Sequence, residues 1–495
     1  MKKISQSTSG FATLEILIAL FILTTALSAS TLVAFGNQTL LVDSKSNREA
    51  LELAETLLET AQVKALTDWR GVVSFATSSA RFESALEVTS IDYVTKQVKA
   101  KVNWKNSYNI NQHVTLSSLI TDFQNTAEGD TCDPTLSGDW TKPETKNTVT
   151  AFKNLVSDPA GNYIITNLDV YHDRLFVTAN NSSQNKETFF VFDVEDSTNP
   201  TLISKLDNDL TLNTGLNAVT IASTTDGVFA YVASATSFTK GQLQIINVSV
   251  NPPVVIKTFK IPLNIVSGSS TQGTGVRIAY KNGYVYLGLS KTVSGPEFNI
   301  IDVRNPNNPV WVGGFTVGSS INDIVIHGEY AYLATPHSQE LMIVDISDPS
   351  NPALVGGYDA PSSNTTGSGK SIYLANNRVY LGRTITSSNP EFYIIDANQP
   401  RTYTPQVLGF KEVNTSINQL LVRESLAYFL TTAGTLQFWD IATTSDITSY
   451  TTGLVLPQNS KGVALDCEKN VLFVGSVPTT GAFIDQGFLS LISTE

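Results

Sequence analysis

The sequence predicts an α+β stem, formed by a long helix and an antiparallel hairpin, followed by an all-β propeller of seven four-stranded blades. Three observations support this prediction. An uncharged apolar segment at 16–35 continues into a helical pattern, residues 97–104 and 113–120 alternate between polar and apolar side chains, and an aromatic-centred strand then recurs seven times. The period of the side chains distinguishes helix from strand in the stem, and the recurrence indicates a repeat architecture.

The composition limits the classes of function. A chain of 495 residues is too long for one ordinary domain, so two or three folded units are expected. Asp and Glu (44) outnumber Lys and Arg (32), and the net charge of −12 argues against a nucleic-acid partner. With two cysteines and four histidines, little material remains for a zinc site or a redox pair.

The apolar segment near the amino terminus is long enough to span a bilayer. Twenty helical residues rise about 30 Å, which matches the hydrocarbon core of a membrane. Lys2 and Lys3 precede the segment, so the positive-inside tendency keeps them cytoplasmic and sends the remaining chain outward. Residues 11–35 are therefore predicted to hold the protein in the cytoplasmic membrane, with the carboxyl-terminal part outside the cell.

An acidic residue at the start of the apolar segment needs an explanation, because an unpaired carboxylate there costs about 2.5 kcal/mol or more. The run Gly10-Phe11-Ala-Thr-Leu-Glu15 resembles the prepilin motif of type IV pilins and type II secretion pseudopilins. The resemblance implies a leader at 1–10, cleavage after Gly10 by a prepilin peptidase and methylation of Phe11. It also implies that Glu15 pairs with the terminal amine of a neighbouring pilin-like subunit during assembly.

Two other interpretations of this segment stay open. A secretory signal peptide would be cut near Ser28 and Ala29, and a plain membrane anchor would never enter a filament.

The rest of the stem is expected to be a helix covered by a hairpin. Leu51, Ala54, Leu58, Ala61 and Ala65 recur at helical spacing, which predicts one helix from Phe11 to about Leu66. The alternating strands at 97–104 and 113–120 then form the hairpin. Helix and hairpin together resemble a minor pilin head, and this resemblance covers residues 11–123.

A polar segment at 124–146 is predicted to be a linker, and the repeats occupy 147–495. The central aromatic residues lie 45 to 55 residues apart: Phe176, Tyr231, Tyr286, Tyr332, Tyr380, Tyr428 and Phe473. A second apolar strand follows each of them and, in most units, an Asn-Pro turn follows that. Four strands per unit at this period predict a β-propeller.

One unit carries a recognisable repeat. The run LMIVDISDPSNPALVGGYD at 341–359 resembles the LVIVD repeat, and 193–203 and 302–315 are weaker copies. The seventh unit lacks an outer strand, which TVTAFKNL at 148–155 is expected to supply, closing the ring and leaving no open sheet edge.

The two cysteines are predicted to form a disulfide. Cys132 lies just before the expected closing strand and Cys467 lies in the last unit, so the closed ring places them near each other. An extracellular compartment permits the bond. Two unrelated free thiols are the alternative.

No motif points to catalysis, to a cofactor or to a metal site, and no catalytic residue is assigned. The turn that begins at Asp345 has oxygen ligands suited to calcium, but its spacing is not that of an EF-hand, and turn formation explains it more simply. Loops at 266–275 and 361–369 are long enough to form a binding face, and inert surface loops are the alternative.

The expected function is therefore that of a minor pilin-like or pseudopilin-like surface subunit whose propeller binds an extracellular glycan, surface or protein. A membrane-tethered propeller enzyme that acts on a polymer is the alternative from another class. A secretion-system pseudopilin that contacts exported substrates is a third interpretation.

Overall fold

The computed structural model describes most of the chain in separate segments. They are residues 9–67, 72–79, 81–90, 95–121, 139–140, 142–149, 155, 163–171, 173–181, 187–196, 199–207, 215–224, 226–234, 241–269, 272–361, 367–450, 453–457, 460–468, 470–478 and 487–494. The chain divides into two compact units, Met1–Phe123 and Gln124–Glu495.

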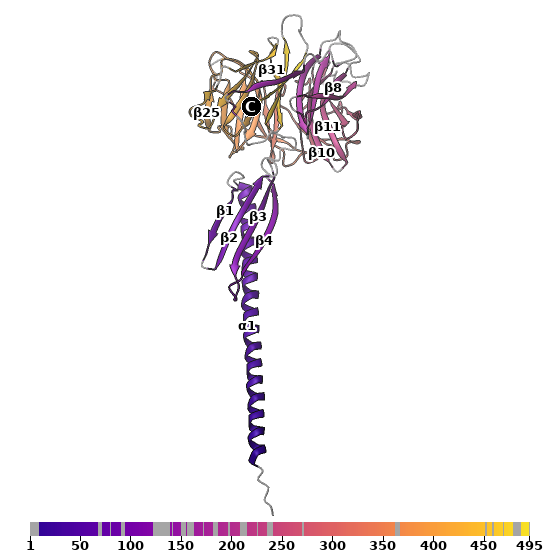
Figure 1. The fold of residues 1–495 in the computed structure, drawn as a ribbon. Helices are drawn as coiled ribbons and strands as arrows, with labels where there is room; N and C mark the ends of the chain where they lie inside the picture. Colours follow the sequence, from indigo (N-terminus) through magenta and orange to yellow (C-terminus); the bar gives the residue numbers. More distant parts are fainter. Residues whose placement is uncertain are drawn as a thin grey trace, which may run out of the picture. The chain divides into compact units, whose positions relative to one another are not determined.

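The first unit contains one long helix and one sheet (Figure 1). Helix α1 (Ser9–Thr67) contains no proline, and Lys64 in its last turn suits the negative end of the helix dipole. The sheet has the order β1-β2-β3-β4. Its strands are β1 (Phe75–Ser78), β2 (Phe82–Ser90), β3 (Thr95–Lys105) and β4 (Asn111–Thr121), each antiparallel to its neighbour.

The carboxyl-terminal half of α1 packs on this sheet. Ala50, Ala54, Ala61 and Ala65 are buried, and they share a cluster with the inward side chains of β3, including Val98, Ala100 and Val102. Small alanine side chains allow the helix to approach the sheet closely, and the alternation along β3 leaves its lysines on the other face.

The predicted hairpin is confirmed, since β3 and β4 pair with Val98 opposite Ser118 and Trp104 opposite Gln112. Its loop is closed by Asn106, whose side-chain oxygen accepts hydrogen bonds from the backbone N–H groups of Tyr108 and Ile110. Strands β1 and β2 enlarge the hairpin to four strands.

The described part of the second unit contains seven antiparallel sheets. The first four are β6 (Tyr163–Tyr171), β7 (Arg174–Asn181), β8 (Glu187–Asp193) and β9 (Thr201–Asp207); β10 (Leu216–Thr224), β11 (Gly227–Ser234), β12 (Leu243–Asn247) and β13 (Val254–Phe259); β14 (Gly275–Lys281), β15 (Tyr284–Leu289), β16 (Phe298–Asp302) and β17 (Val310–Phe315); and β18 (Asp323–His327), β19 (Tyr330–Ala334), β20 (Leu341–Asp345) and β21 (Ala353–Tyr358). We number these sheets 1 to 4 in chain order.

Sheets 5 to 7 follow in the same order. They are β22 (Gly369–Ala375), β23 (Arg378–Arg383), β24 (Phe392–Asp396) and β25 (Val407–Lys411); β26 (Ile417–Arg423), β27 (Leu426–Thr431), β28 (Thr435–Asp440), β29 (Thr448–Ser449) and β30 (Leu454–Val455); and β31 (Ser460–Glu468), β32 (Val471–Pro478), β33 (Phe488–Ser493) and β5 (Glu144–Val149). In sheet 6 the outer position is shared by β29 and β30, which both pair with β28.

The seven sheets form a closed, propeller-like ring. The first strand of each sheet contacts the first strand of the next, and β31 of sheet 7 contacts β6 of sheet 1. Each of the seven interfaces between neighbouring sheets also holds its own buried apolar cluster. The predicted central aromatics are all buried in these layers: Phe176, Tyr231, Tyr286, Tyr332, Tyr380, Tyr428 and Phe473.

The outer strand of sheet 7 does come from the start of the second unit, but it lies earlier than predicted. Strand β5 covers 144–149 and pairs with β33, with Val149 opposite Leu489 and Glu144 opposite Ser493. The sequence predicted the segment 148–155, which contains more apolar residues, as this strand. An outermost strand has one open edge, so polar residues such as Glu144 and Thr145 suit it.

Candidate functional site

One end of each sheet carries the loops that are the best candidates for binding. In a four-stranded antiparallel meander, the connection between the second and third strands and the connection to the next sheet leave from the same end. We call this end of the ring the loop face. The predicted binding loops at 266–275 and 361–369, as far as they are described, both join neighbouring sheets there.

A buried ion pair joins two sheets below the loop face. Arg383, at the end of β23, donates from Nε to Oε2 and from Nη2 to Oε1 of Glu340, both at 2.6 Å. The two side chains are 0% and 3% exposed. Arg383 also donates from Nη1 to the carbonyl oxygen of Pro390 and lies against the ring of Tyr393. The bidentate geometry is the strongest form of such a pair.

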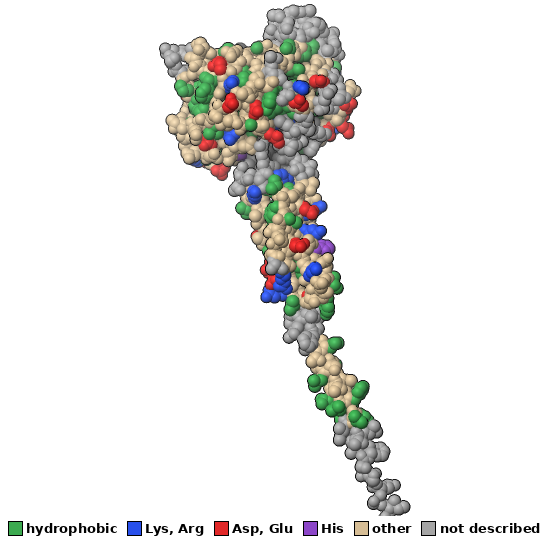
Figure 2. Space-filling view, turned by 60° about the vertical axis from the view of Figure 1, so that its left-hand side comes forward, with side chains coloured by type: hydrophobic (Ala, Val, Ile, Leu, Met, Phe, Trp, Pro, Cys, Tyr) green, Lys and Arg blue, Asp and Glu red, His purple; other side chains and the backbone are tan. Residues whose placement is uncertain are grey.

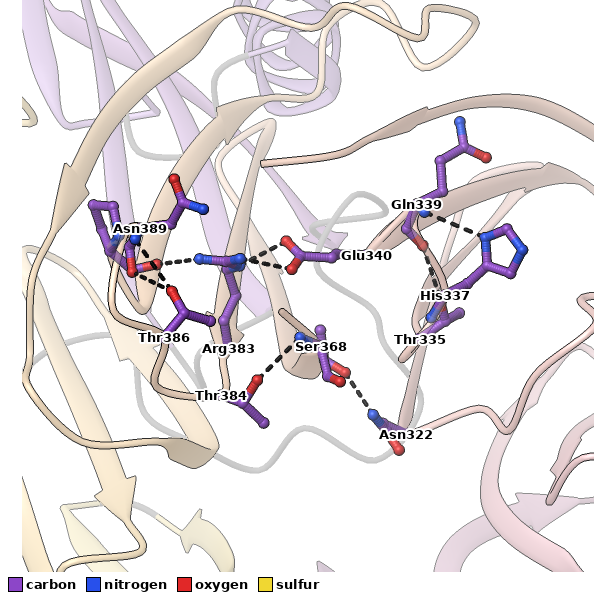
Figure 3. A network of polar contacts seen from close by, with 12 residues as sticks. Asn322, Thr335, His337, Gln339, Glu340, Ser368, Arg383, Thr384, Thr386 and Asn389 are labelled. Carbon is purple, nitrogen blue, oxygen red and sulfur yellow. Dashed lines mark hydrogen bonds and ion pairs between the residues drawn. The ribbon is translucent and has the colours of Figure 1, made fainter. Parts of the chain in front are cut away.

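Short hydrogen bonds hold the loops around this ion pair (Figure 3). The Thr335 hydroxyl donates to the carbonyl oxygen of Gln339 at 2.7 Å, and the Ser368 N–H donates to the Thr384 hydroxyl at 3.0 Å. A Cβ atom at Gly367 would collide with the guanidinium of Arg383 and the carboxylate of Glu340, so only glycine fits there. Because its polar atoms are enclosed, the pair fastens sheets 4 and 5 together and leaves no charge for a ligand.

Glu340 belongs to a position that is occupied by Glu or Gln in four consecutive sheets. Gln242, Glu297, Glu340 and Glu391 each precede the third strand of their sheet, and all four are buried. Glu297 Oε2 accepts hydrogen bonds from the N–H groups of Val317 and Gly318, both at 2.9 Å. Gln242, Glu297 and Glu391 accept hydrogen bonds from backbone N–H groups that follow the fourth strand of their sheet. Glu340 differs because its carboxylate pairs with Arg383.

The aspartate turn at the opposite end of sheet 4 forms its own capping hydrogen bonds. Asp345 Oδ1 accepts from the N–H (2.9 Å) and the hydroxyl (2.7 Å) of Ser347, and Asp348 Oδ1 accepts in the same way from Ser350. These bonds to Ser347 and Ser350 lower the pKa of Asp345 and of Asp348. The carboxylates act as turn formers, as the simpler interpretation predicted. Among the described residues, no group of three or more His, Cys, Asp or Glu side chains is arranged to hold a metal ion.

The stem carries a second candidate surface, on the amino-terminal half of α1. Eight large apolar side chains between Leu17 and Leu32 are each at least half exposed: Leu17, Ile18, Leu20, Phe21, Ile22, Leu23, Leu27 and Leu32. Figure 2 shows hydrophobic side chains, in green, gathered on this part of the helix. No helix within the described ranges combines the length and the apolar character that a membrane crossing requires.

The predicted cleavage motif lies at the start of α1. Gly10, Phe11 and Glu15 lie within the bounds of α1, but their side chains fall outside the described residues. The same holds for one half of the predicted disulfide, Cys132. Its partner Cys467 lies in β31 and is fully buried beside Trp140 and Leu472.

Sequence reasoning missed both Arg383 and the buried acid position. Arg383 ends the strand VYLGR, where sheet 3 has VYLGL with Leu289, so an arginine replaces a leucine at a position that is buried in both sheets. The recurrence of Glu or Gln directly before the third strand, in four consecutive repeats, could have indicated a buried polar position. Aligning the repeats on their central tyrosines reveals both features.

One comparison with known proteins supports the repeat assignment. Residues 318–360 match the family model described as the LVIVD repeat, and this range contains the predicted copy at 341–359. The crystal structure of the computationally designed Ika8 protein aligns with a TM-score of 0.43 and 11% identity, over 70% of this chain and 84% of that chain. No curated protein matches the chain. The second unit is a β-repeat, propeller-like domain in which residues 318–360 are similar to the LVIVD repeat.

Proposed function

We propose that this chain is a type IV pilin-like surface subunit, in which a stem anchors and assembles the protein and a seven-bladed β-propeller binds an extracellular glycan, surface or protein. The proposal has an assembly part, carried by α1, and a binding part, carried by the loop face of the ring.

The eight exposed apolar side chains between Leu17 and Leu32 of α1 are the observation that supports the assembly part. Each fully buried side chain of this size contributes about 1.5–3 kcal/mol through removal from water, so eight of them strongly favour a covered state. A contiguous apolar surface of this kind marks an interaction site. A lipid bilayer and the apolar helices of neighbouring subunits both provide a suitable cover.

The hydroxyl groups in the same segment support an apolar environment. Thr25 Oγ1 donates to the carbonyl oxygen of Phe21 at 2.8 Å, Ser28 Oγ to that of Thr24 at 2.7 Å, and Thr31 Oγ1 to that of Leu27 at 2.7 Å. A polar group within a bilayer needs a partner inside the protein, because water does not reach it. These residues therefore suit lipid as well as they suit a helical filament core.

The division of α1 fits a stem that serves two environments. Its amino-terminal half exposes apolar residues, whereas its carboxyl-terminal half packs on the sheet through Ala50, Ala54, Ala61 and Ala65. In the proposed role, a prepilin peptidase cuts after Gly10, Phe11 becomes the methylated amino terminus, and Glu15 pairs with the amine of a neighbouring pilin-like subunit.

The ring supports the binding part because it is a rigid platform for loops. The sheets of the closed ring hold the buried core, so the sequence and length of the connections on the loop face can change without disrupting that core. A head of this size would crowd the side of a tightly packed filament, so we propose a minor subunit that presents the ring at the cell surface.

The first test is the amino terminus of the protein recovered from native cells, measured by intact-mass and terminal-peptide mass spectrometry. A chain that begins at methylated Phe11 supports the proposal. A chain that retains Met1, or that is cut near Ala29, contradicts the assembly part and reduces the protein to a tethered or secreted ring.

A matched pair of variants then tests the role of Glu15. Glu15→Gln is expected to leave membrane localisation and cleavage unchanged and to prevent recovery of the protein in sheared surface filaments. Glu55→Gln, an exposed position on the same helix, is the control. Equal recovery of both variants from filaments would contradict the role of Glu15.

A further inference from the structure

We propose that residues 107–110 of the stem, which we call the hairpin tip, dock on the headgroup layer of an anionic lipid bilayer. The hairpin tip connects β3 to β4. This inference rests on the membrane part of the proposed function, because it requires the amino-terminal half of α1 to lie in a bilayer. It goes beyond that function by assigning a lipid surface to a second element of the stem.

The hairpin tip is held in one conformation against the helix. Ser107 donates to Asp43 Oδ1 from its N–H at 3.1 Å and from its hydroxyl at 2.9 Å. Within the turn, the Asn106 N–H donates to the carbonyl oxygen of Ile110 at 3.0 Å, and the Asn106 side-chain oxygen accepts from Tyr108. Because these bonds fix the loop before it meets a partner, it loses little conformational freedom on binding.

The hairpin tip exposes large apolar side chains. Tyr108 is 66% exposed and Ile110 is 56% exposed. Val42, the neighbour of Asp43 in α1, is 49% exposed. A tyrosine combines an apolar ring with a polar hydroxyl, and such residues are enriched at the interface between membrane and water. The tip therefore carries the side chains that suit the boundary between acyl chains and headgroups.

The hairpin tip lies beside the end of the uncharged part of α1. No charged residue occurs from Ile16 to Val42, and Asp43 follows. Residues 16–42 rise about 40 Å as a helix, or about 38 Å along the membrane normal at a tilt of about 20°. A hydrocarbon core of about 30 Å and one headgroup layer of roughly 5–8 Å span nearly this distance. A helix that starts at the inner edge of the core therefore brings the tip to the outer headgroup layer.

Positive charges near the hairpin tip lie on the side of the apolar half of α1. Lys45 pairs with Glu49 at 3.7 Å, and Arg48 pairs with Glu52 at 3.6 Å. In both pairs the cation precedes the acid by about one helical turn, so the cation is nearer to the apolar half. Lys105, next to the tip in β3, is exposed. Figure 2 shows blue Lys and Arg side chains at this end of the sheet.

This arrangement of charge favours anionic lipid over neutral lipid. Lys and Arg side chains close to a membrane surface attract anionic headgroups, and the attraction decreases within a Debye length. Long basic side chains also reach toward the headgroups while their carbon chains cover apolar surface. The tip and its flanking cations thus match a bilayer surface in both apolar character and charge.

The experiment places a fluorescent reporter at the hairpin tip of the full chain, reconstituted from detergent into vesicles. Tyr108→Trp keeps an interfacial aromatic residue, and the wild type supplies the background of its five tryptophans. The vesicles contain phosphatidylglycerol and phosphatidylcholine in equal parts, with a lipid brominated close to its headgroup as quencher. We expect this lipid to reduce the additional emission about twofold, because the ring lies at the interface.

A second pair of variants tests the role of charge in the Tyr108→Trp background. Lys105→Gln is expected to weaken quenching in the anionic vesicles and to have no effect in vesicles of phosphatidylcholine alone. Lys99→Gln is the matched control, because Lys99 lies on the same strand about 20 Å further from the tip. It is expected to leave quenching unchanged. Ile110→Trp replaces Tyr108→Trp if the latter does not fold.

A reporter in the apolar half of α1 separates this inference from the proposed function. Quenching of Leu27→Trp by deeply brominated lipid, without quenching of Tyr108→Trp, overturns the inference and leaves the membrane anchor intact. The absence of quenching in both variants contradicts the anchor as well.

Three further outcomes would overturn the assignment of anionic lipid. They are equal quenching in anionic and neutral vesicles, equal effects of Lys105→Gln and Lys99→Gln, and an emission of Tyr108→Trp that responds only to protein concentration. The last outcome would assign the hairpin tip to a neighbouring copy of the chain.

Discussion

The backbone N–H of Val170 donates a hydrogen bond of 2.8 Å to Asp466 Oδ2, and so joins the first sheet of the ring to the last. The two residues are 296 positions apart in the chain. Asp466 Oδ1 also accepts from the N–H of Cys467 at 2.8 Å. One carboxylate therefore holds the innermost strands together at the place where the ring closes.

Asp466→Ala is expected to weaken this closure. The change leaves the N–H groups of Val170 and Cys467 without their acceptor, and each unsatisfied buried group costs about 1–3 kcal/mol. Hydrogen exchange of β6 and β31 should accelerate, and urea should unfold the chain at a lower concentration. The exposed Asp446→Asn is the matched control, and equal effects of the two variants would contradict a special role of Asp466.

A second inter-sheet bond predicts how stability depends on pH. Asp323 Oδ2 accepts from the N–H of Ile372 at 3.0 Å, and burial raises the pKa of this carboxyl although Arg277 lies 3.9 Å away. The folded protein then binds the proton more tightly than the unfolded chain does. Stability should therefore fall as pH rises from the unfolded pKa to the folded one, and should stay level above it.

Asp323→Asn is expected to remove this dependence while it preserves the hydrogen bond. Asn167 occupies the same position in sheet 1, and its side-chain oxygen accepts from the N–H of Val219 at 3.0 Å. The melting temperature of the wild type minus that of the variant should fall as pH rises between 4 and 7, because only the wild type loses the contribution of Asp323. A difference that stays constant over this range would contradict a raised pKa of Asp323.

The aromatic periodicity predicted the ring because it reports on packing. A large side chain at the centre of the second strand fills the space between neighbouring sheets, so Phe176 through Phe473 recur wherever a sheet recurs. The alternation at 97–104 predicted β3 for the same reason. In both cases, burial of one face imposed a pattern that the residues had to follow.

Features that depend on one residue, or on few apolar side chains, escaped prediction. Strand β1 has four exposed residues and β5 is polar, so neither carries an apolar period. Arg383 looks like any residue at the end of a strand until its partner Glu340 is placed across the interface. Ion pairs between distant positions follow from three-dimensional contact, which local pattern does not encode.

The Arg383–Glu340 pair predicts a distinctive double-mutant cycle. Arg383→Leu alone leaves the carboxylate of Glu340 buried without a counter-charge, and the expected loss of stability is about 3–5 kcal/mol. The double variant Glu340→Gln with Arg383→Leu recreates the Gln242 and Leu289 combination of sheets 2 and 3, where Gln242 Oε1 accepts from the N–H of Ile261 at 3.0 Å.

Replacement of a buried ion pair by well-packed neutral residues is often neutral or stabilising. We therefore expect the double variant to recover most of the stability lost by the single one, measured as the midpoint of urea unfolding. Additive losses from the two substitutions would mean that the Gln242 and Leu289 environment cannot be transferred to this interface.

A disulfide is expected to close the ring covalently. Cys467 is buried in sheet 7, and no cysteine among the described residues is a free thiol. We predict a disulfide between Cys132 and Cys467, which closes a loop of more than three hundred residues and, in the chain-entropy model, stabilises the fold by roughly 5 to 6 kcal/mol at most. Peptide mapping without reduction should recover the two cysteines in one cross-linked peptide. Cys467→Ser and Cys132→Ser should each lower the melting temperature, and reducing agent should lower that of the wild type but not of either variant.

Alkylation of both thiols in the native, unreduced protein would contradict the bond. Because Val170 and Asp466 also hold the closure, the reduced ring is expected to remain folded at room temperature.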